Sequence, residues 1–341
     1  MNHHRRRILQ GLSAIPVAGA LGLSPWAAAA TELRISHQFP GGTLTEGDFR
    51  DRLCRRFAQE LARRSNGSLT AVVYPNSSLM KTNAQFSALR KGALDMSLVP
   101  LNYAGGEVPE TNIGLMPGII TNYDKGTAFR HSEAGKMLYN ILADKGVLLV
   151  SWIWQSGGVA SRNKALIEPE DARGMKVRGG GREMDTVLKA AGAAVLNLPS
   201  NEIYAAMQTG ALDAAMTSST SLMSFRLEEV AKQLTTGRGQ AYWFMFEPLM
   251  ISRVVYERLG RDEQNLIMTL GTEMEKFALD SCKVDDNQVA RVYVKAGGKA
   301  YDLSQATVRR WQDIARRTAW KDFAARSDSC AALMKAVEKS L

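Results

Sequence analysis

The stretch KVRGGGREMD, Lys176–Asp185, places one arginine beside three consecutive glycines. Arg178 closes a short segment typical of a strand, and a helical pattern begins near Arg182. In open α/β sheets, ligands bind beyond the carboxyl ends of strands, where a helix N-terminus offers free N–H groups. An arginine adds a rigid fork that matches a carboxylate, and Gly179 lets the backbone approach it. We expect Arg178 and Gly179 to bind an anion; alternatively, Arg178 pairs with a structural acid.

Motifs for catalysis or metal binding are missing from the sequence. Gly179–Gly181 begins a dinucleotide-like pattern, but Met184 stands where that pattern has its third glycine. A hydrolase nucleophile elbow, a phosphate-binding P-loop and a paired-histidine zinc motif do not occur. We therefore expect a binding protein with no catalytic residues, metal or cofactor. The alternative is an exported enzyme that acts on an organic acid.

The N-terminus has the layout of an export signal. Arg5–Arg7 precede an apolar run over residues 8–23 and a run of small residues over 27–30. The paired arginines before an Ile-Leu pair also fit a twin-arginine signal. Glycines and a proline interrupt the apolar run, which argues against a permanent membrane span. We expect residues 1–30 to be removed on export to the periplasm.

The charge pattern argues against a nucleic-acid partner. The formal net charge is +9 over 341 residues. The arginine pairs lie in helix-like patterns without interleaved aromatic residues, which is typical of solvated helix faces. An exported protein would also rarely meet nucleic acid.

The three cysteines, Cys54, Cys282 and Cys330, leave two alternatives open. Export permits a disulfide, and a Cys282–Cys330 pair is possible. Three small buried hydrophobic side chains are the other interpretation. The odd number leaves at least one thiol unpaired, and the wide spacing excludes a metal knuckle.

A helix-to-strand unit occurs twice in the chain. Its signature, Gly-Ala-Leu-Asp, stands at residues 92–95 and again at 210–213, each time between a helical pattern and a strand pattern. Alternating strands and helices predict a parallel sheet, and the repeat predicts two α/β lobes. From about Asp262 the chain is charged and periodic, which predicts one long helix, or two joined near Gly271, spanning the lobes.

Five sequence blocks follow one another in a characteristic order and spacing: LRISHQFPGGTLTEGDF, SLTAVVYPNSSLMKTNAQFSALRKGALDMSLVP, NIGLMPGII, LIEPEDARGMKVR and NLPSNEIYAAMQTGALDAAM. Together they resemble the periplasmic solute receptors of tripartite ATP-independent periplasmic (TRAP) transporters, and the resemblance extends over almost all of the chain after residue 30. Phe39, in the first block, is an expected ligand contact. In the family, an arginine at the position of Arg178 pairs with the ligand carboxylate.

The resemblance implies an α/β, two-lobed periplasmic binding protein fold with hinge strands and a long lobe-spanning helix. Lobe I is expected over residues 31–154 plus about 243–283. Lobe II, with the C-terminal helices, is expected over about 155–242 plus 284–341. The lobes would close around a small organic acid, and a membrane permease would take up the ligand. A receptor that serves a sensor kinase is the alternative.

The chain departs from the family pattern at two places. Many relatives have a second arginine about twenty residues before Arg178, where this chain has Gly157-Gly158-Val159. Many also have an asparagine where this chain has Met216–Ser219. We expect the hydroxyl groups of Thr217 and Ser218 to donate hydrogen bonds to the ligand instead. One fewer cation makes a dicarboxylate ligand less suitable.

Aromatic residues are expected to compensate for the missing cation. Trp152 and Trp154 share one side of a strand by two-residue alternation, and Trp243 lies in the aromatic run YWFMFEP near the return of the hinge. Tyrosine and tryptophan suit a ligand with a flat apolar body and one polar end. The sequence therefore favours a monocarboxylate, either aromatic or a 2-oxo or 2-hydroxy acid, with a dicarboxylate as the alternative.

Overall fold

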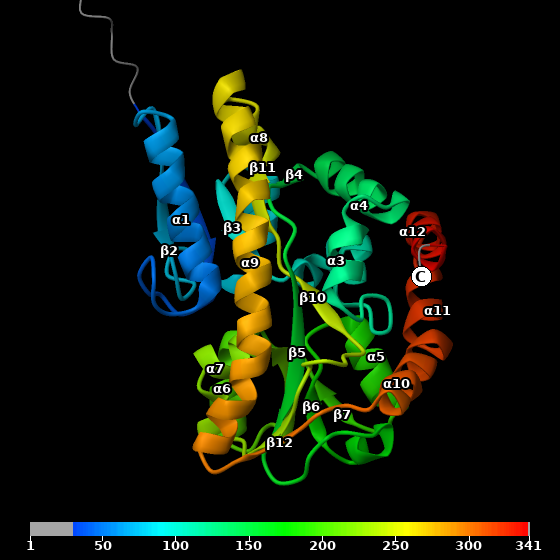
Figure 1. The fold of residues 1–341 in the computed structure, drawn as a ribbon. Coiled ribbons are helices and arrows are strands. Elements are labelled where there is room, and N and C mark those ends of the chain that lie inside the picture. Colours follow the sequence, from blue (N-terminus) through cyan, green and yellow to red (C-terminus); the bar gives the residue numbers. More distant parts are fainter. Residues whose placement is uncertain (1–29, 340–341) are drawn as a thin grey trace, which may run out of the picture.

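The computed structural model describes residues 30–339 and shows two α/β lobes, each built around its own sheet (Figure 1). The expected export signal, residues 1–30, lies outside the described residues except for Ala30. Within residues 30–339, no helix combines the length and apolar character that a membrane crossing requires. The two sheets confirm the expected α/β fold class.

The sheet of lobe I has five strands in the order β2-β1-β3-β11-β4. Their bounds are β1 Thr31–His37, β2 Leu69–Tyr74, β3 Met96–Leu98, β4 Val147–Leu149 and β11 Leu249–Ser252. Helix α1, Phe49–Arg64, packs on this sheet through Leu53, Phe57 and Leu61, which are completely buried. The four-residue spacing of these side chains gives the helix its apolar face.

Lobe II contains the second sheet, in the order β12-β9-β5-β8-β6-β7, with β10 paired to one end of β5. Its strands are β5 Trp154–Ser161, β6 Lys176–Arg178, β7 Ala194–Leu196, β8 Ala214–Ser218, β9 Gln233–Thr235, β10 Phe244–Phe246 and β12 Lys299–Tyr301. Helices α5 Arg182–Ala190, α6 Ile203–Gln208 and α7 Ser219–Ser224 belong to this lobe.

The sheets are mixed, which corrects the expectation of purely parallel ones. β1 runs parallel to β2 and β3, and β6 runs parallel to β7 and β8. The antiparallel members are β11 in lobe I and β5 in lobe II. Each of these strands is reached from the other lobe, so it enters its sheet from the opposite end. The crossing strands therefore form the hinge.

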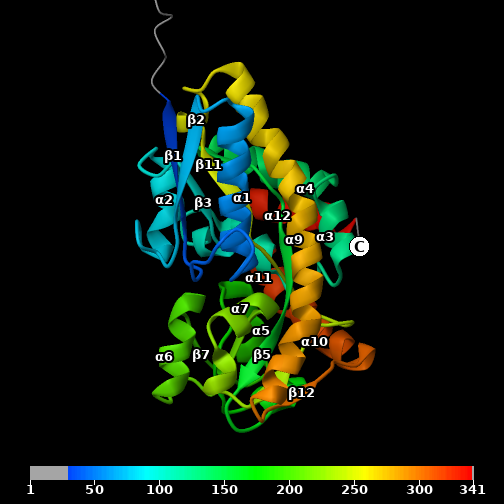
Figure 2. The same ribbon diagram turned by 60° about the vertical axis from the view of Figure 1, so that its left-hand side comes forward.

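Helix α9, Arg261–Lys295, is one continuous helix that runs along both lobes (Figures 1 and 2). It contacts α1 of lobe I and α7 and β12 of lobe II. Gly271 does not interrupt it. A Cβ at this position would lie 2.1 Å from the carbonyl oxygen of Val150, in the chain that crosses toward lobe II. Glycine is therefore needed for close packing of helix against hinge.

The C-terminal helices connect the lobes on a second side. They are α10 Gln305–Arg317, α11 Ala319–Ala324 and α12 Asp328–Glu338. Whereas α10 and α11 contact α5 of lobe II, α12 packs on α4, Glu133–Asp144, of lobe I. The segment after residue 284, expected with lobe II, thus ends on lobe I. Cys54, Cys282 and Cys330 are all free and buried, so the possible Cys282–Cys330 disulfide is not formed.

Remaining short elements connect the sheets and carry several side chains of the lobe interface. The helices are α2 Gln85–Arg90, α3 Tyr123–Phe129 and α8 Arg253–Tyr256. The 3₁₀ turns are η1 Thr82–Ala84, η2 Leu101–Ala104, η3 Pro109–Leu115, η4 Pro169–Ala172, η5 Ser200–Glu202 and η6 Leu227–Glu229. Since η2 follows β3 at the carboxyl end of the lobe I sheet, it faces lobe II.

Candidate functional site

Arg178 lies at the interface between the two lobes. It ends β6, and only 1% of its surface is exposed. Its Nε donates to the carbonyl of Leu198 at 3.0 Å, and its Nη1 donates to the carbonyl of Met216 at 2.6 Å. Its Nη2 donates to the hydroxyl of Tyr103, on lobe I, at 2.9 Å. All three acceptors are neutral.

Within residues 30–339, no carboxylate forms an ion pair with Arg178. The acid that interacts with it electrostatically is Asp185, on α5. Burial raises the pKa of Asp185 to about 6, although Arg178 and Lys189 act in the opposite direction. A buried guanidinium surrounded by neutral acceptors retains most of its positive field, which favours an incoming anion.

The glycine turn after Arg178 gives the guanidinium room. Gly180 has a φ of +91°, in the left-handed region, and a Cβ there would lie 2.5 Å from Nη1 of Arg178. A Cβ on Gly179 would lie 2.4 Å from the carboxylate of Asp185. Both positions therefore require glycine, and the guanidinium folds back over the turn that starts α5.

Lobe I reaches this turn through η2. Tyr103 accepts a hydrogen bond from Arg178 and another, at 3.1 Å, from the backbone N–H of Ser200 at the start of η5. Its neighbour Asn102 donates to the carbonyl of Gly180 at 2.7 Å. Because these contacts join the lobes at Arg178, any anion held there would touch both lobes.

A second buried arginine, Arg50 of α1, also reaches across the interface, but its charge is matched. Its Nη2 lies 2.6 Å from Asp48 and its Nη1 lies 3.0 Å from Glu247. Nη2 also donates to Ser221 at 3.0 Å, and Nη1 donates to Ser218 at 3.3 Å, both on lobe II. This guanidinium therefore holds the lobes together through internal partners.

The pKa values of the two acids beside Arg50 are shifted in opposite directions. Burial alone would raise the pKa of Asp48, but the Arg50 guanidinium outweighs it and holds the pKa below its usual value. Burial raises the pKa of Glu247 even though Arg50 acts against it. The difference follows from geometry, because Asp48 makes two side-chain bonds to Arg50, whereas Glu247 makes one.

Four of the expected ligand contacts lie near the interface. The hydroxyl of Thr217 is buried and has no hydrogen-bond partner within residues 30–339, whereas that of Ser218 contacts Arg50 and caps α7. Phe39 is completely buried beneath Arg50, whose guanidinium carbon lies 3.5 Å from the ring centroid. The fourth residue, Trp243, packs against Gly157 of β5.

Trp243 explains the missing second arginine. A Cβ on Gly157 would lie 2.2 Å from Cη2 of Trp243 and 2.3 Å from the carbonyl oxygen of Thr217. No side chain fits at position 157, because the indole ring already fills that space. An aromatic ring therefore stands over β5 and β8 where the sequence comparison suggested a cation.

Trp152 and Trp154 are placed elsewhere. They do face the same side, as predicted, but that side meets α3 of lobe I rather than Arg178. Trp154 stacks on Phe246 with 4.8 Å between ring centroids and meets Phe129 edge-on at 5.4 Å. Trp152 contacts the same two rings. The two tryptophans thus form part of an aromatic cluster beside the hinge.

Tyr103 and the cluster of Arg50 with Asp48 and Glu247 were not predicted from the sequence. Tyr103 stands shortly after the lobe I strand β3, and a position beyond the carboxyl end of a strand is the signal that identified Arg178. Arg50 gave no comparable signal, since Asp48, Arg50 and Asp51 are ordinary residues at a helix start. Glu247 is about two hundred residues away in sequence, so its pairing with Arg50 required the fold.

A mixed α/β fold of two lobes with crossing strands and a shared long helix is that of a solute-binding protein. The family model "Bacterial extracellular solute-binding protein, family 7" matches residues 42–327. A "Solute-binding protein" of Albidiferax ferrireducens is 60% identical over 337 residues, covering 99% of each chain. The chain belongs to this family, the periplasmic solute-binding proteins of TRAP transporters.

Solved structures agree with this fold. A TRAP periplasmic solute-binding protein from Rhodoferax ferrireducens, with bound malonate, is 63% identical and matches with a TM-score of 0.89, over 90% of this chain and 97% of its own. One from Sulfitobacter, with bound β-D-galacturonate, matches with a TM-score of 0.81 at 18% identity, over 91% of this chain and 100% of its own. The second likeness concerns the fold alone.

Proposed function

We propose that this receptor binds a short organic acid at the lobe interface, with Arg178 as the principal contact for a carboxylate. The observation that carries the proposal is the buried guanidinium of Arg178, which has only neutral acceptors within residues 30–339. A carboxylate would supply the missing negative charge through two parallel hydrogen bonds. The malonate in the 63% identical relative supports this class of ligand.

The other contacts favour a small ligand. Thr217 offers an unpartnered hydroxyl, whereas the backbone of Gly179 is already hydrogen-bonded to the carboxylate of Asp185. Trp243 fills the space over Gly157, which restricts the length of the ligand. Because Arg50 is neutralised by Asp48 and Glu247, one carboxylate finds a free cation, and a second group would meet neutral donors. Short acids with one or two carboxylates are therefore the candidates.

Calorimetric titration tests the assignment. Native protein is titrated with malonate, lactate and phenylpyruvate, and the tightest ligand is then titrated into Arg178→Lys. Lysine keeps the charge but loses the fork, so we expect affinity to fall roughly 10- to 100-fold, as for one lost charge-assisted hydrogen bond. Arg182→Lys is the matched control, since Arg182 lies four residues on and pairs with Asp322 at the surface. Unchanged affinity in a folded Arg178→Lys protein would refute the site.

The proposal includes delivery of the bound acid, unaltered, to a TRAP-type permease. Closure of the lobes would exclude water and strengthen the ion pair at Arg178. Ligand uptake by cells that carry both the receptor and its permease is the test. Loss of uptake on deletion of either component supports delivery. Chemical conversion of the ligand by purified receptor would instead indicate the enzyme alternative.

We also propose export by the twin-arginine route. The supporting feature is the arginine pair Arg5-Arg6, followed after one residue by an apolar run. Replacing both arginines with lysine keeps the charge and removes the motif. The variant should accumulate in the cytoplasm, whereas normal periplasmic recovery would indicate the general secretion route.

A further inference from the structure

The aromatic cluster of Trp152, Trp154, Phe129 and Phe246 borders a pocket apart from Arg178. We call it the hinge pocket. Its volume is about 290 Å³, at the lower end of the roughly 300–1,000 Å³ typical of small-molecule sites. It lies between α3, the crossing strand and α9, and its lining includes Arg130, Trp152, Trp154, Thr272, Glu275 and Lys276.

One polar atom of the hinge pocket is buried and unpartnered. Trp154 is 6% exposed, and its indole N–H has no hydrogen-bond acceptor within residues 30–339. Two other buried tryptophans do have acceptors: the N–H of Trp311 donates to Ile167 and that of Trp320 to Pro117, both at 2.8 Å. Since an indole N–H can only donate, the group that completes Trp154 must be an acceptor.

Arg130 contributes a cation to the same pocket. Its Nη1 donates to Glu275 at 2.5 Å and its Nη2 donates to Thr272 at 3.2 Å. A guanidinium has five N–H donors, so others stay available. Glu275 balances the charge of Arg130, and Lys276 pairs with Asp280 at 2.6 Å, so the pocket offers unused N–H donors of Arg130 rather than a net positive charge. These donors, together with the indole N–H of Trp154, favour a ligand that brings hydrogen-bond acceptors, as a carboxylate does.

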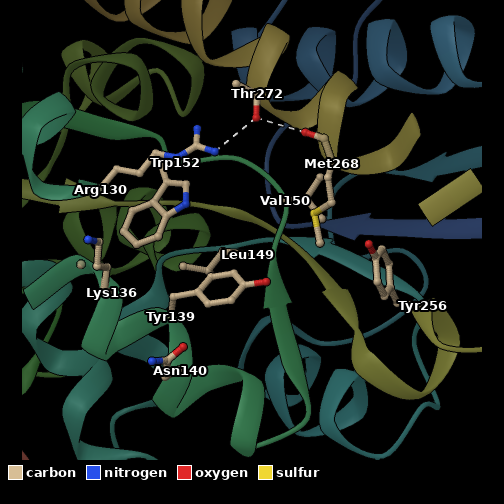
Figure 3. Close-up of a pocket in the computed structure, with 11 residues that line it drawn as sticks. Arg130, Lys136, Tyr139, Asn140, Leu149, Val150, Trp152, Tyr256, Met268 and Thr272 are labelled. Atoms are coloured by element: carbon tan, nitrogen blue, oxygen red, sulfur yellow. Dashed lines mark hydrogen bonds between the residues drawn. The ribbon is translucent and has the colours of Figure 1, made fainter. Parts of the chain in front are cut away.

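The pocket has an approach from the surface. A second, wider cavity adjoins it and shares Arg130, Trp152 and Thr272 with it. Figure 3 shows this outer cavity, with Arg130 hydrogen-bonded to Thr272 and with the rings of Trp152 and Tyr139 between α4 and α9. Lys136 lies on its α4 side. A ring-bearing molecule would thus pass aromatic faces and a further cation before it reaches Trp154.

From this geometry we infer that the hinge pocket is a second ligand site, which takes a planar, ring-bearing organic acid. The ring packs against the aromatic cluster, and the carboxylate accepts from the indole N–H of Trp154 and from Arg130. This site is separate from the interface at Arg178 and does not depend on the function proposed there. It gives Trp152 and Trp154 a binding role, at a different place from the one the sequence suggested.

Nuclear magnetic resonance of the indole N–H groups tests this site directly. The processed protein is labelled with ¹⁵N-tryptophan and carries Arg178→Lys, so that binding at the lobe interface is suppressed. Trp154→Phe assigns the signal. Titration with phenylacetate should shift the Trp154 signal progressively, whereas acetate, which lacks the ring, should not. The Trp154→Phe exchange should weaken phenylacetate binding about fivefold. In this variant the Trp152 signal is used to measure binding.

Two controls make the test decisive. Trp320→Phe removes an indole whose N–H is already satisfied, and it should leave phenylacetate binding unchanged. Benzylamine presents the same ring with a positive charge and should bind more weakly than phenylacetate. The inference is overturned if phenylacetate leaves the Trp154 signal in place. It is equally overturned if benzylamine binds as tightly as phenylacetate.

Discussion

Arg50 and Arg178 are both buried, and each reaches toward the opposite lobe. They differ in the charge of their hydrogen-bond partners. Arg50, on lobe I, has Asp48 and Glu247 within ion-pair distance, whereas Arg178, on lobe II, has carbonyl and hydroxyl oxygens. Both are almost fully buried, so solvent contributes little to either. Burial alone therefore does not identify a ligand contact. Arg178 differs from Arg50 in that no carboxylate within residues 30–339 forms an ion pair with it, and this difference supports the proposed contact with an anion.

The largest effect is expected for Arg50→Met. This change leaves Asp48 and Glu247 buried without their cation, and breaking a buried pair typically costs about 3–5 kcal/mol. Denaturant unfolding of ligand-free protein measures this loss. Arg63→Met, at an exposed pair with Glu60, should leave the unfolding curve in place. An Arg50→Met protein of native stability would remove the contrast between the two arginines.

Arg178→Met should affect stability less and ligand response more. Removing a buried cation without a carboxylate partner relieves a desolvation cost, while the carbonyls of Leu198 and Met216 lose their donor. We expect the unfolding free energy of the ligand-free protein to stay within about 2 kcal/mol of native. Stabilisation by added ligand, measured as a rise in melting temperature, should disappear. A loss as large as that for Arg50→Met would show that Arg178 is mainly structural.

Asp185→Asn tests the electrostatic difference between Arg178 and Arg50. With its pKa raised to about 6, Asp185 is protonated in the folded protein below that pH and ionised above it. The ionised carboxylate opposes the field of Arg178, so anion affinity should fall as the pH rises through about 6. Stability should fall as the pH rises from about 3.8, the ordinary pKa of the group, to about 6, because the folded state holds this proton more tightly than the unfolded state.

The measurement for Asp185 is the ratio of ligand affinities between Asp185→Asn and native protein. At low pH the two should agree, and well above pH 6 the variant should bind about fivefold more tightly. Taking the ratio cancels titration of the ligand itself and of Glu183, whose pKa burial raises to about 7 in both chains. A ratio that does not change with pH would separate Asp185 from the site.

Ser218→Ala gives the smallest expected effect. Its hydroxyl accepts from Arg50 and caps α7 by accepting from the N–H of Ser221. Loss of such a cap costs about 1 kcal/mol of stability. If Ser218 serves Arg50 rather than the ligand, ligand affinity should change far less than in Arg178→Lys. A matching loss of affinity would return Ser218 to the binding residues expected from sequence.

The sequence predicted the architecture better than the site. The repeated Gly-Ala-Leu-Asp unit is physical: Gly92 and Gly210 have positive φ, and Asp95 and Asp213 each accept a backbone N–H from a neighbouring strand. Such local patterns are readable because they follow from turn geometry. The surroundings of Trp154 could not be predicted. Two-residue alternation shows that two side chains share one face of a strand, but not which part of the protein that face contacts.

The long helix α9 supports both lobes, and at Gly271 the crossing chain lies directly against it. A methyl group at this position would overlap the carbonyl oxygen of Val150. The helix and the crossing chain would then have to move apart. Small-angle scattering of ligand-free Gly271→Ala should register a changed radius of gyration. We therefore expect the angle between the lobes of the ligand-free protein to depend on the close packing at Gly271.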